Sequence, residues 1–445
     1  MFQDRRSLIK RTLLFLVLSF TAFYFYKLAT DEQVQLSLFQ DSRLSREMIS
    51  KTISAKILNN EYPTEAVFGQ ATPSDPHLYK INYTLQPDLQ SHAQELLERY
   101  RPDYAAIVMM DAKTGEILAM SSFEKKKDYG SNLALKATYP AASIFKVITA
   151  ATAIDRSGLN PDHRIAFNGG NYTLFKKNVL SDKVNRWTRF ITMKDAFARS
   201  INTAFGRLSM ESIEPHDLSE YANRFLFNQE IPSDFHVQRS VASVPTEKGF
   251  ELTEVASGYN RFNTLSPVHG ALIASTIVNG GKMPDPHLVK TIMNAQNESI
   301  YSRANLTDFD IAKQIITPES AEKVKQMMEQ TVLSGTSRKT FRQFVRDRKF
   351  KEVEMGGKTG HFSGTDPKGR TDWFVGYASD GTDKIAIATI TVNVEKWTVK
   401  SSALGEMMFR KYFKTKLDDR DAALSAAAEE APQIKKTVKA KKRRS

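Results

Sequence analysis

The apolar and polar positions of this chain follow different periods in three successive regions. Near the start, the apolar runs AAIVMMD and EILAMSSF flank Ala-Lys-Thr-Gly, and this pattern predicts a β-hairpin whose turn contains Gly115. From Ser143 to about Phe344 the spacing is mainly helical, with breaks at Pro, Gly and Asn. Three later apolar runs predict strands: VEMGGKTGHF, DWFVGYAS and KIAIATITVNV.

The order of these regions predicts the fold class. Helices are expected from Pro87 to Tyr100, before the hairpin, and from Ala403 to Leu417, after the last strand. Two early and three late strands around a helical region predict an α+β fold: a five-stranded antiparallel sheet flanked by helices, with a helical subdomain. No repeat or interdomain linker is evident between Lys80 and Leu417, so we expect one folded unit there.

The N-terminus has the pattern of a membrane anchor. Basic residues precede an uncharged, mostly apolar run: Arg5, Arg6, Lys10 and Arg11 come before Thr12 to Tyr26. As a helix this run would span roughly 22 Å, against a hydrocarbon core of about 30 Å, and the flanking Tyr and Lys side chains suit the interface. Lysine stands where a cleavage site needs a small residue, which favours an uncleaved anchor. The basic flank predicts a single-pass protein of the inner (cytoplasmic) membrane with its folded part on the periplasmic side.

The chain is therefore expected to have five segments. They are a cytoplasmic basic segment at 1–11, a signal anchor or transmembrane helix at 12–29, a juxtamembrane linker at 30–80, a folded domain at 81–417 and a disordered basic tail at 418–445. The tail is predicted to be disordered because it is low in complexity and rich in Lys and Arg near its end.

Composition narrows the chemistry. The 445 residues are 41% hydrophobic and 25% charged, as in ordinary globular proteins. The chain has no cysteine, which excludes disulfides, thiolate nucleophiles and Cys-ligated metals. The eight histidines lack metal-ligand spacing, so neither a metal nor another cofactor is expected. The net charge of +13, placed outside the cytoplasm, favours anionic envelope surfaces as partners over nucleic acid.

A serine followed three positions later by lysine is a candidate nucleophile and base. The pattern occurs at Ser7, Ser122, Ser143 and Ser320. Only at Ser143 do apolar residues surround the lysine, Lys146, whose desolvation would favour the neutral amine that can take the hydroxyl proton. A helix N-terminus there would also support an oxyanion. A serine cap followed by a snorkelling lysine fits the local sequence equally well, and the other three copies are predicted to lie at the surface.

Two further motifs can be interpreted in more than one way. Ser200 and Asn202, in ARSINTAF, could relay a proton and bind a substrate amide, or could simply cap a helix. Lys-Thr-Gly occurs twice. The first copy, at 113–115, is predicted to be the hairpin turn. The second lies in a predicted strand, where Lys358 and Thr359 could bind an anionic terminus and Gly360 could let an extended peptide approach. The alternative is an ordinary strand glycine.

Taken in this order, the three motifs resemble those of penicillin-binding proteins and serine β-lactamases. The resemblance extends from about Tyr83 to Phe413 and includes YTLQPDLQ, AAIVMMDAKTGEILAM, ARSINTAF, GTSRKTF and DWFVGYA. It implies a cleft between the antiparallel sheet and the helical subdomain. It also implies that Ser143 attacks a D-Ala-D-Ala peptide bond to give an acyl-enzyme, with Lys146 as the base.

The resemblance implies roles for the other motif residues as well. Ser200 and Asn202 would shuttle protons and hold substrate. Lys358 and Thr359 would set the electrostatics and bind the terminal carboxylate, beside Gly360.

His361 departs from the family pattern, which usually has Thr or Ser at this position. Its backbone N–H, with that of Ser143, would still form the oxyanion hole. Residues 359, 361 and 363 share one face of a strand, so Ser363 could partly supply the missing hydroxyl. An imidazolium could also bind a carboxylate, but with a pKa near ~6.5 this would depend on pH.

The expected function is that of a penicillin-binding peptidoglycan D,D-transpeptidase. Roughly 50 residues separate the predicted anchor from the domain, so no glycosyltransferase module is expected. The expected partners are stem peptides ending in D-Ala-D-Ala, β-lactams, the membrane through the anchor, and a separate membrane glycan polymerase. The alternatives are a D,D-carboxypeptidase or endopeptidase with the same site, a β-lactamase or β-lactam sensor, and a catalytically impaired envelope scaffold. A β-lactamase is less favoured because no Glu-x-x-Leu-Asn is present.

Overall fold

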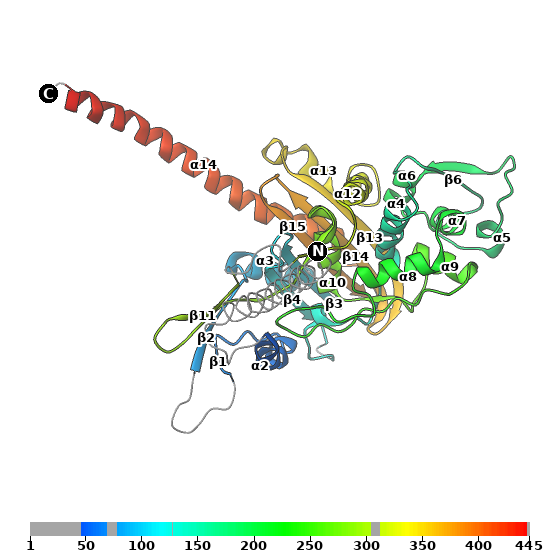
Figure 1. Cartoon of the computed structure of the whole chain (residues 1–445), viewed down its shortest axis with the longest axis horizontal. Coiled ribbons are helices and arrows are strands. Elements are labelled where there is room, and N and C mark those ends of the chain that lie inside the picture. The colour runs from blue at the N-terminus through cyan, green and yellow to red at the C-terminus, as the bar shows by residue number, and fades with distance from the viewer. Residues whose placement is uncertain (1–45, 69–77, 127, 304–311, 443–445) are drawn as a thin grey trace, which may run out of the picture. The chain divides into compact units, whose positions relative to one another are not determined.

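The computed structural model describes four stretches of the chain, residues 46–68, 78–126, 128–303 and 312–442 (Figure 1). The predicted basic segment at 1–11 and transmembrane helix at 12–29 lie outside these residues. Among the described helices, none combines the length and the apolar character needed to cross a bilayer. The chain divides into two compact units, which are described separately below.

The larger unit comprises residues 54–62, 84–288 and 308–445, and its centre is a five-stranded antiparallel sheet. The strands follow the order β13-β14-β15-β3-β4. Their bounds are β3 (Tyr104–Asp111), β4 (Ile117–Glu124), β13 (Glu354–Thr365), β14 (Lys368–Ser379) and β15 (Lys384–Asn393). The two early and three late strands therefore share one sheet, as predicted, and β13 lies at one of its edges.

The connection between β3 and β4 confirms the predicted hairpin turn. The Asp111 carboxylate accepts hydrogen bonds from the backbone N–H groups of Lys113, at 2.8 Å, and Thr114, at 2.9 Å. Gly115 has a φ of +82°, and a Cβ there would lie 2.1 Å from the carbonyl oxygen of Asp285. Only glycine fits this position, both for its left-handed conformation and for its lack of a side chain.

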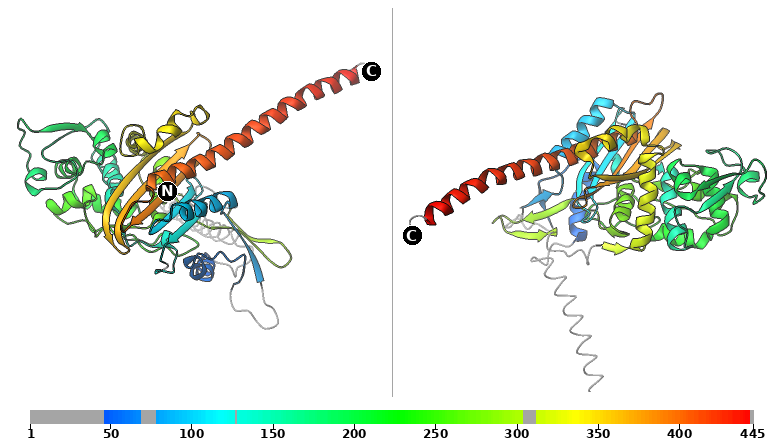
Figure 2. Two further views of the ribbon diagram at one scale, coloured as in Figure 1. Left: turned by 180° about the vertical axis from the view of Figure 1, so that it is seen from behind. Right: turned by 90° about the horizontal axis from the view of Figure 1, so that it is seen from above.

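Helices cover both faces of the sheet (Figure 2). On one face lies α10 (Pro267–Val278), whose Gly270 allows close packing: a Cβ there would be 3.1 Å from side-chain atoms of both Ala388 and Val375. On the other face lie α3 (Pro87–Tyr100), α13 (Arg338–Arg346) and α14 (Ser401–Lys442). Their apolar side chains, including Phe409 of α14, form a core with alternate residues of the strands, including Phe374 and Ile387.

The helical subdomain lies beside the β13 edge of the sheet (Figure 1). Its helices are α4 (Lys146–Asp155), α5 (Lys176–Val179), α6 (Met193–Ala198), α7 (Asn202–Ser212), α8 (Pro215–Arg224) and α9 (Phe250–Ser257). It also contains a two-stranded hairpin that the mainly helical pattern did not predict, β6 (Arg164–Phe167) and β7 (Arg189–Thr192). The 16-residue helix α12 (Pro318–Leu333) packs against α4, α6 and β13 and so links the subdomain to the sheet.

Short elements complete the larger unit. They are η1 (Leu133–Leu135), β5 (Tyr139–Pro140), η2 (Ala142–Phe145), β8 (Thr264–Leu265), β9 (Lys282–Pro284), β12 (Ala312–Gln314) and η4 (Arg348–Phe350). Strand β5 pairs with β8, and β9 pairs with β12.

The smaller unit corrects two sequence-based predictions. It contains a four-stranded sheet of β1 (Glu65–Val67), β2 (Leu78–Tyr83), β10 (Val289–Met293) and β11 (Ser299–Ser302), in the order β1-β2-β10-β11. The helix α2 (Arg46–Leu58) crosses the boundary between the units. The described part of the predicted linker at 30–80 is thus structured, and 81–417 is not one unit. The cause is non-local pairing: β2 finds its partner β10 about two hundred residues later, which local periodicity does not indicate.

The C-terminal tail also differs from the prediction. The expected helix from Ala403 to Leu417 begins at Ser401 and continues to Lys442, so most of the predicted disordered tail at 418–445 is helical. The low complexity of this segment comes largely from repeated Ala, Glu and Lys, which are among the strongest helix formers. Low complexity alone was therefore a poor guide to its conformation.

Candidate active site

A tight turn leads into α4 and carries the predicted nucleophile. Ser143 lies in the 3-10 turn η2, directly before α4, and Lys146 is the first residue of α4. The Lys146 Nζ lies 2.9 Å from the Ser143 Oγ. Ala142, just before the serine, has a φ of +49°, a strained conformation for a residue with a Cβ. Gly258 packs on this turn, where a Cβ would lie 1.9 Å from the carbonyl oxygen of Ala142.

Lys146 is fully buried, which decides between the two interpretations of this motif. Its Nζ donates a hydrogen bond of 2.7 Å to the Asn202 Oδ1 and another to the carbonyl oxygen of Ser257. Burial, followed by the positive charge of Lys358, lowers the pKa of Lys146 well below its usual value. A snorkelling surface lysine is excluded, and the neutral amine needed to take a proton from Ser143 is favoured.

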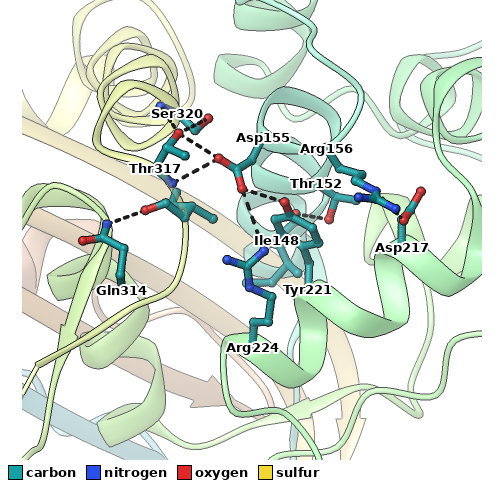
Figure 3. A network of polar contacts seen from close by, with 11 residues as sticks. Ile148, Thr152, Asp155, Arg156, Asp217, Tyr221, Arg224, Gln314, Thr317 and Ser320 are labelled. Carbon is teal, nitrogen blue, oxygen red and sulfur yellow. Dashed lines mark hydrogen bonds and ion pairs between the residues drawn. The ribbon is translucent and has the colours of Figure 1, made fainter. Parts of the chain in front are cut away.

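The far end of α4 is held by a polar network (Figure 3). The Asp155 carboxylate accepts hydrogen bonds from the Tyr221 hydroxyl at 2.6 Å and from the Thr317 Oγ1 at 2.8 Å. It also accepts one from the Thr317 backbone N–H at 3.1 Å. Thr317 is the N-cap of α12, where its Oγ1 accepts from the Ser320 N–H. The helix that carries Lys146 is thus joined to α8 and α12.

Ser200 and Asn202 face the two lysines. The turn between α6 and α7 places Ser200 in the left-handed region, with a φ of +55°. The Ser200 Oγ accepts a hydrogen bond of 3.0 Å from the Lys358 Nζ, and the Asn202 side-chain amide donates one of 2.7 Å to the carbonyl oxygen of Tyr172. Neither side chain caps α7, whose N-cap residue Ile201 makes no side-chain hydrogen bond. The helix-capping alternative is therefore wrong.

The second Lys-Thr-Gly lies on β13, the edge strand nearest to η2. Lys358 is fully buried, donates to the carbonyl oxygen of Thr359 at 2.9 Å, and has its pKa lowered to about 7 by burial. A Cβ on Gly360 would lie 3.2 Å from the backbone nitrogen of Ser143, tighter than most real contacts. Glycine at this position lets the strand approach the serine, which the ordinary strand-glycine interpretation does not explain.

A cavity of about 270 Å³ joins the three motifs. Its lining residues are Ser143, Tyr172, Ser200, Asn202, Gly258, Tyr259, Thr336, Thr359, Gly360, His361 and Phe362. Lys146 and Lys358 lie behind this lining and reach it through their hydrogen bonds to Ser143 and Ser200. Residues of all three motifs, which lie between positions 143 and 360 of the chain, thus line or adjoin one cavity.

Ser363 does not lie where the sequence predicted. It is exposed and lines a different cavity, together with Arg261, Lys368 and Arg370. Ser363 points to the same face of β13 as Thr359. It lies two residues beyond His361, however, near the end of the long hairpin formed by β13 and β14. The prediction that it replaces a hydroxyl in the Ser143 cavity is not supported by this position.

His361 does line the cavity, with a side chain that is 65% exposed. It pairs across the sheet with Asp372, and its Nδ1 lies 3.7 Å from the Asp372 Oδ1. The Trp397 ring stands edge-on to the imidazole, with ring centroids 6.3 Å apart. Partial desolvation in the cleft, followed by the charge of Lys358, lowers the pKa of His361, so the ring is favoured in its neutral form near pH 7. Burial raises the pKa of Asp372 to about 6.

Sequence reasoning missed Thr336 and Tyr172. The Thr336 and Thr359 hydroxyl oxygens lie 2.6 Å apart, so Thr336 supports the side chain expected to bind an anionic terminus. Thr336 lies within GTSRKTF, a stretch noted only as a flank of the third motif. Tyr172 follows the loop NGGN, whose Gly and Asn were interpreted only as helix breaks.

Comparisons with known proteins give a consistent result. Residues 105–414 match the family described as the penicillin binding protein transpeptidase domain. Stage V sporulation protein D of Bacillus subtilis is 25% identical over 318 residues, which make up 66% of this chain but only 46% of that protein. The peptidoglycan D,D-transpeptidase PbpA of Mycobacterium tuberculosis is 24% identical over 363 residues, 72% of this chain and 69% of that protein.

Solved structures show the same fold. The D,D-transpeptidase domain of an Eggerthella lenta peptidoglycan glycosyltransferase has a TM-score of 0.61 at 22% identity, covering 78% of this chain and 85% of that one. The imipenem acyl-enzyme complex of penicillin-binding protein A from M. tuberculosis has a TM-score of 0.60 at 21% identity, covering 76% and 80%.

Proposed function

Because the chain belongs to the penicillin-binding protein transpeptidase domain family, we propose that it is a peptidoglycan D,D-transpeptidase that acts through an acyl-enzyme on Ser143. The observation that carries this proposal is the hydrogen bond between the Ser143 Oγ and the fully buried Lys146. Such an amine is poised to take the hydroxyl proton as the oxygen attacks a carbonyl carbon.

In the proposed acylation step, Ser143 attacks the carbonyl between the two terminal D-Ala residues of a stem peptide. The proton of the Ser143 hydroxyl passes to Lys146. As the peptide C–N bond breaks, the departing D-Ala amine takes this proton through Ser200, which the hydrogen bond to Lys358 orients, and Lys146 is neutral again. The backbone N–H groups of Ser143 and His361 stabilise the oxyanion; such donors contribute about 100- to 1000-fold each.

In the second step, an amine of another stem peptide attacks the ester carbonyl, and the crosslinking amide forms as the bond to the Ser143 Oγ breaks. The amine gives up a proton to Lys146, which passes it to the departing Ser143 oxygen. The edge position of β13 supports this proposal, since an extended peptide can pair with the outer side of an edge strand. Asn202 binds a substrate amide, and Thr359, supported by Thr336, binds the donor carboxylate. We also propose that the protein is anchored in the cytoplasmic membrane, faces the periplasm, and receives glycan from a separate membrane polymerase.

Labelling with a fluorescent penicillin tests the acyl-enzyme. The purified wild-type protein should form a covalent adduct, and Ser143→Ala should form none. Ser122→Ala is the matched control, because Ser122 also precedes a lysine by three residues but hydrogen-bonds to Asn60 at 3.2 Å, in an exposed position. Absence of a Ser143-dependent adduct would contradict the proposal and favour an inactive scaffold, and rapid release of hydrolysed drug would favour a β-lactamase.

The acceptor is tested separately by analysing cell-wall peptides after deletion of the protein. Loss of crosslinked peptides would support a transpeptidase. Accumulation of pentapeptides with no loss of crosslinks would instead indicate a D,D-carboxypeptidase, and accumulation of crosslinks an endopeptidase. The same Ser143 chemistry serves all three, so only the products distinguish them.

A further inference from the structure

Large exposed apolar side chains are frequent in one segment of the helical subdomain, which runs from the loop after β6 into β7. They are Tyr172, Phe175, Leu180, Val184, Trp187 and Phe190. Trp187 is 72% exposed and Val184 is 65% exposed. Soluble surfaces rarely gather large apolar groups in this way unless they bind something. The proposed acyl-enzyme chemistry uses none of these side chains except Tyr172, which lines the cavity.

The same segment is strongly basic. Its exposed charged residues are Lys176, Lys177, Lys183, Arg186 and Arg189, with Asp182 as the single acid among them. The guanidinium of Arg186 lies 4.7 Å from the centre of the Trp187 ring, and that of Arg164 lies 5.5 Å from the Phe190 ring. Aromatic rings and cations are thus interleaved, an arrangement suited to a ligand with both apolar faces and negative charges.

This surface is continuous with the candidate active site. The Asn202 backbone N–H donates to the carbonyl oxygen of Asn171 at 2.7 Å, and the Asn202 side chain holds the carbonyl of Tyr172. The Arg189 guanidinium donates to the Asn171 side-chain oxygen at 2.8 Å and also contacts the carbonyl of Gly169. A polymer whose peptide entered the cavity past Tyr172 would therefore meet the basic and aromatic side chains next.

We propose that the segment from Tyr172 to Phe190 binds the glycan and neighbouring stem peptides of the polymer whose stem peptide occupies the cavity. The aromatic rings would pack on the C–H faces of sugar rings, and the lysines and arginines would face peptide carboxylates. This inference rests on the proposed function, since it assumes a glycopeptide substrate. A lipid surface is the less favoured occupant, because the segment starts at the rim of the cavity and its helix α5 has only four residues.

Cosedimentation with purified insoluble peptidoglycan tests the proposal, using the full-length protein in detergent. The variant Trp187→Ala/Phe190→Ala and the variant Lys183→Glu/Arg186→Glu should each bind the polymer roughly tenfold more weakly, as expected for aromatic and arginine residues at an interface. Both should keep wild-type labelling by fluorescent penicillin, a small molecule that does not reach this surface. The matched controls are Leu333→Ala/Val345→Ala, two exposed apolar residues of the same unit, and Lys339→Glu.

Unchanged sedimentation of both variants would overturn the proposal. Binding to phospholipid vesicles would then show what the surface does instead, because loss of binding to anionic, but not neutral, vesicles in the same variants would identify a membrane-binding surface. If the double alanine variant lost penicillin labelling, its active site would be disturbed and its sedimentation could not be interpreted. The charge-reversed variant, which keeps both aromatic rings, would then test the binding surface. A different result would separate the two proposals. If the wild type did not label with penicillin but still bound peptidoglycan, and the variants bound it more weakly, the proposed function would be contradicted and the proposed binding surface would be supported.

Discussion

The tripeptide Lys-Thr-Gly occurs twice in this protein, and the two copies differ in almost every physical respect. At 113–115 it forms the turn of a hairpin, and the Lys113 side chain crosses the exposed surface to donate a hydrogen bond of 2.6 Å to the carbonyl of Thr382. At 358–360 it lies on an edge strand, and Lys358 is fully buried beside Ser200. The comparison teaches that burial and partners, not the tripeptide, give the lysine its chemistry.

The two glycines are needed for different reasons. Gly115 has a φ of +82°, which a residue with a Cβ rarely adopts. Gly360 is not in that region, and its requirement is space, because a Cβ would lie 3.2 Å from the Ser143 nitrogen and 3.3 Å from the Ile144 nitrogen. One glycine shapes the chain, and the other leaves room for a neighbour.

Of all the paired substitutions in the two Lys-Thr-Gly copies, replacement of the lysines should give the largest difference in acylation rate. Lys358→Ala removes the partner of Ser200 and should slow acylation by penicillin about 100- to 1000-fold, in the range of general acid–base contributions. Lys113→Ala should leave the acylation rate within about twofold of wild type, since it breaks one exposed hydrogen bond. Stopped-flow acylation rates, with thermal unfolding as a check on folding, measure both. Equal effects would refute the distinction.

Replacing the two glycines should give opposite phenotypes. Gly360→Ala should slow acylation about tenfold with little change in the free energy of unfolding, because it displaces the backbone of the nucleophile turn. Gly115→Ala should lower the free energy of unfolding by about 1–3 kcal/mol, through backbone strain and the contact with the Asp285 carbonyl, and leave acylation nearly unchanged. Denaturant titration and acylation rates together test this, and a large stability loss in Gly360→Ala would count against it.

Replacing the lysine should shift the pH profile of acylation in the second Lys-Thr-Gly copy but not in the first. The charge of Lys358 is the second cause, after burial, of the lowered pKa of Lys146. In Lys358→Met that charge is gone, so the pKa of Lys146 rises, and the pH at which acylation is half-maximal should move upward. Rates measured from pH 5 to 9, a range spanning the pKa of about 7 for Lys358 and usable for most proteins, give the midpoint. Lys113→Met should not move it.

The residue after each tripeptide should give the smallest effect. Glu116 follows the turn copy, and His361 follows the strand copy. Because burial, followed by the charge of Lys358, lowers the pKa of His361, its ring is favoured in the neutral form near pH 7 and becomes a cation only in more acidic solution than an ordinary histidine requires. His361→Thr, which introduces a hydroxyl at the cavity, should raise the rate of penicillin acylation about threefold at pH 7. An unchanged or lower rate would mean that the imidazole itself assists the reaction.

Much of the fold could be predicted because the spacing of apolar residues over short stretches of the chain determines those elements. The hairpin around Gly115 and the helix from Pro87 to Tyr100 follow from alternation and helical spacing over a few residues. The buried environment of Lys146 was indicated by its apolar neighbours. That Lys146 meets Asn202, and that Lys358 meets Ser200, was expected only from the resemblance to a family.

The predictions failed where distant segments meet. Pairing of β2 with β10 created a second unit that no local signal marked. Thr336 reaches Thr359 through the packing of the α12–α13 connection against β13, and Gly258 reaches Ala142 at the end of another helix. Ser363 had the right alternation but lies too far along its strand. Periodicity assigns a side chain to a face, but it does not say how far along that face a cavity extends.

The Asp155 network has a mechanical consequence. The turn η2, which carries Ser143 and leads into α4, packs on β13. At its other end α4 is joined to α12 through Asp155 and Thr317, and α12 itself packs on β13. The helix α4 with its turn, the helix α12 and the strand β13 thus each contact the other two. None of them can shift without breaking one of these contacts. The distance between the backbones of Ser143 and Gly360 is therefore fixed by these contacts before a substrate binds. The protein should then lose little conformational entropy when the acyl bond forms.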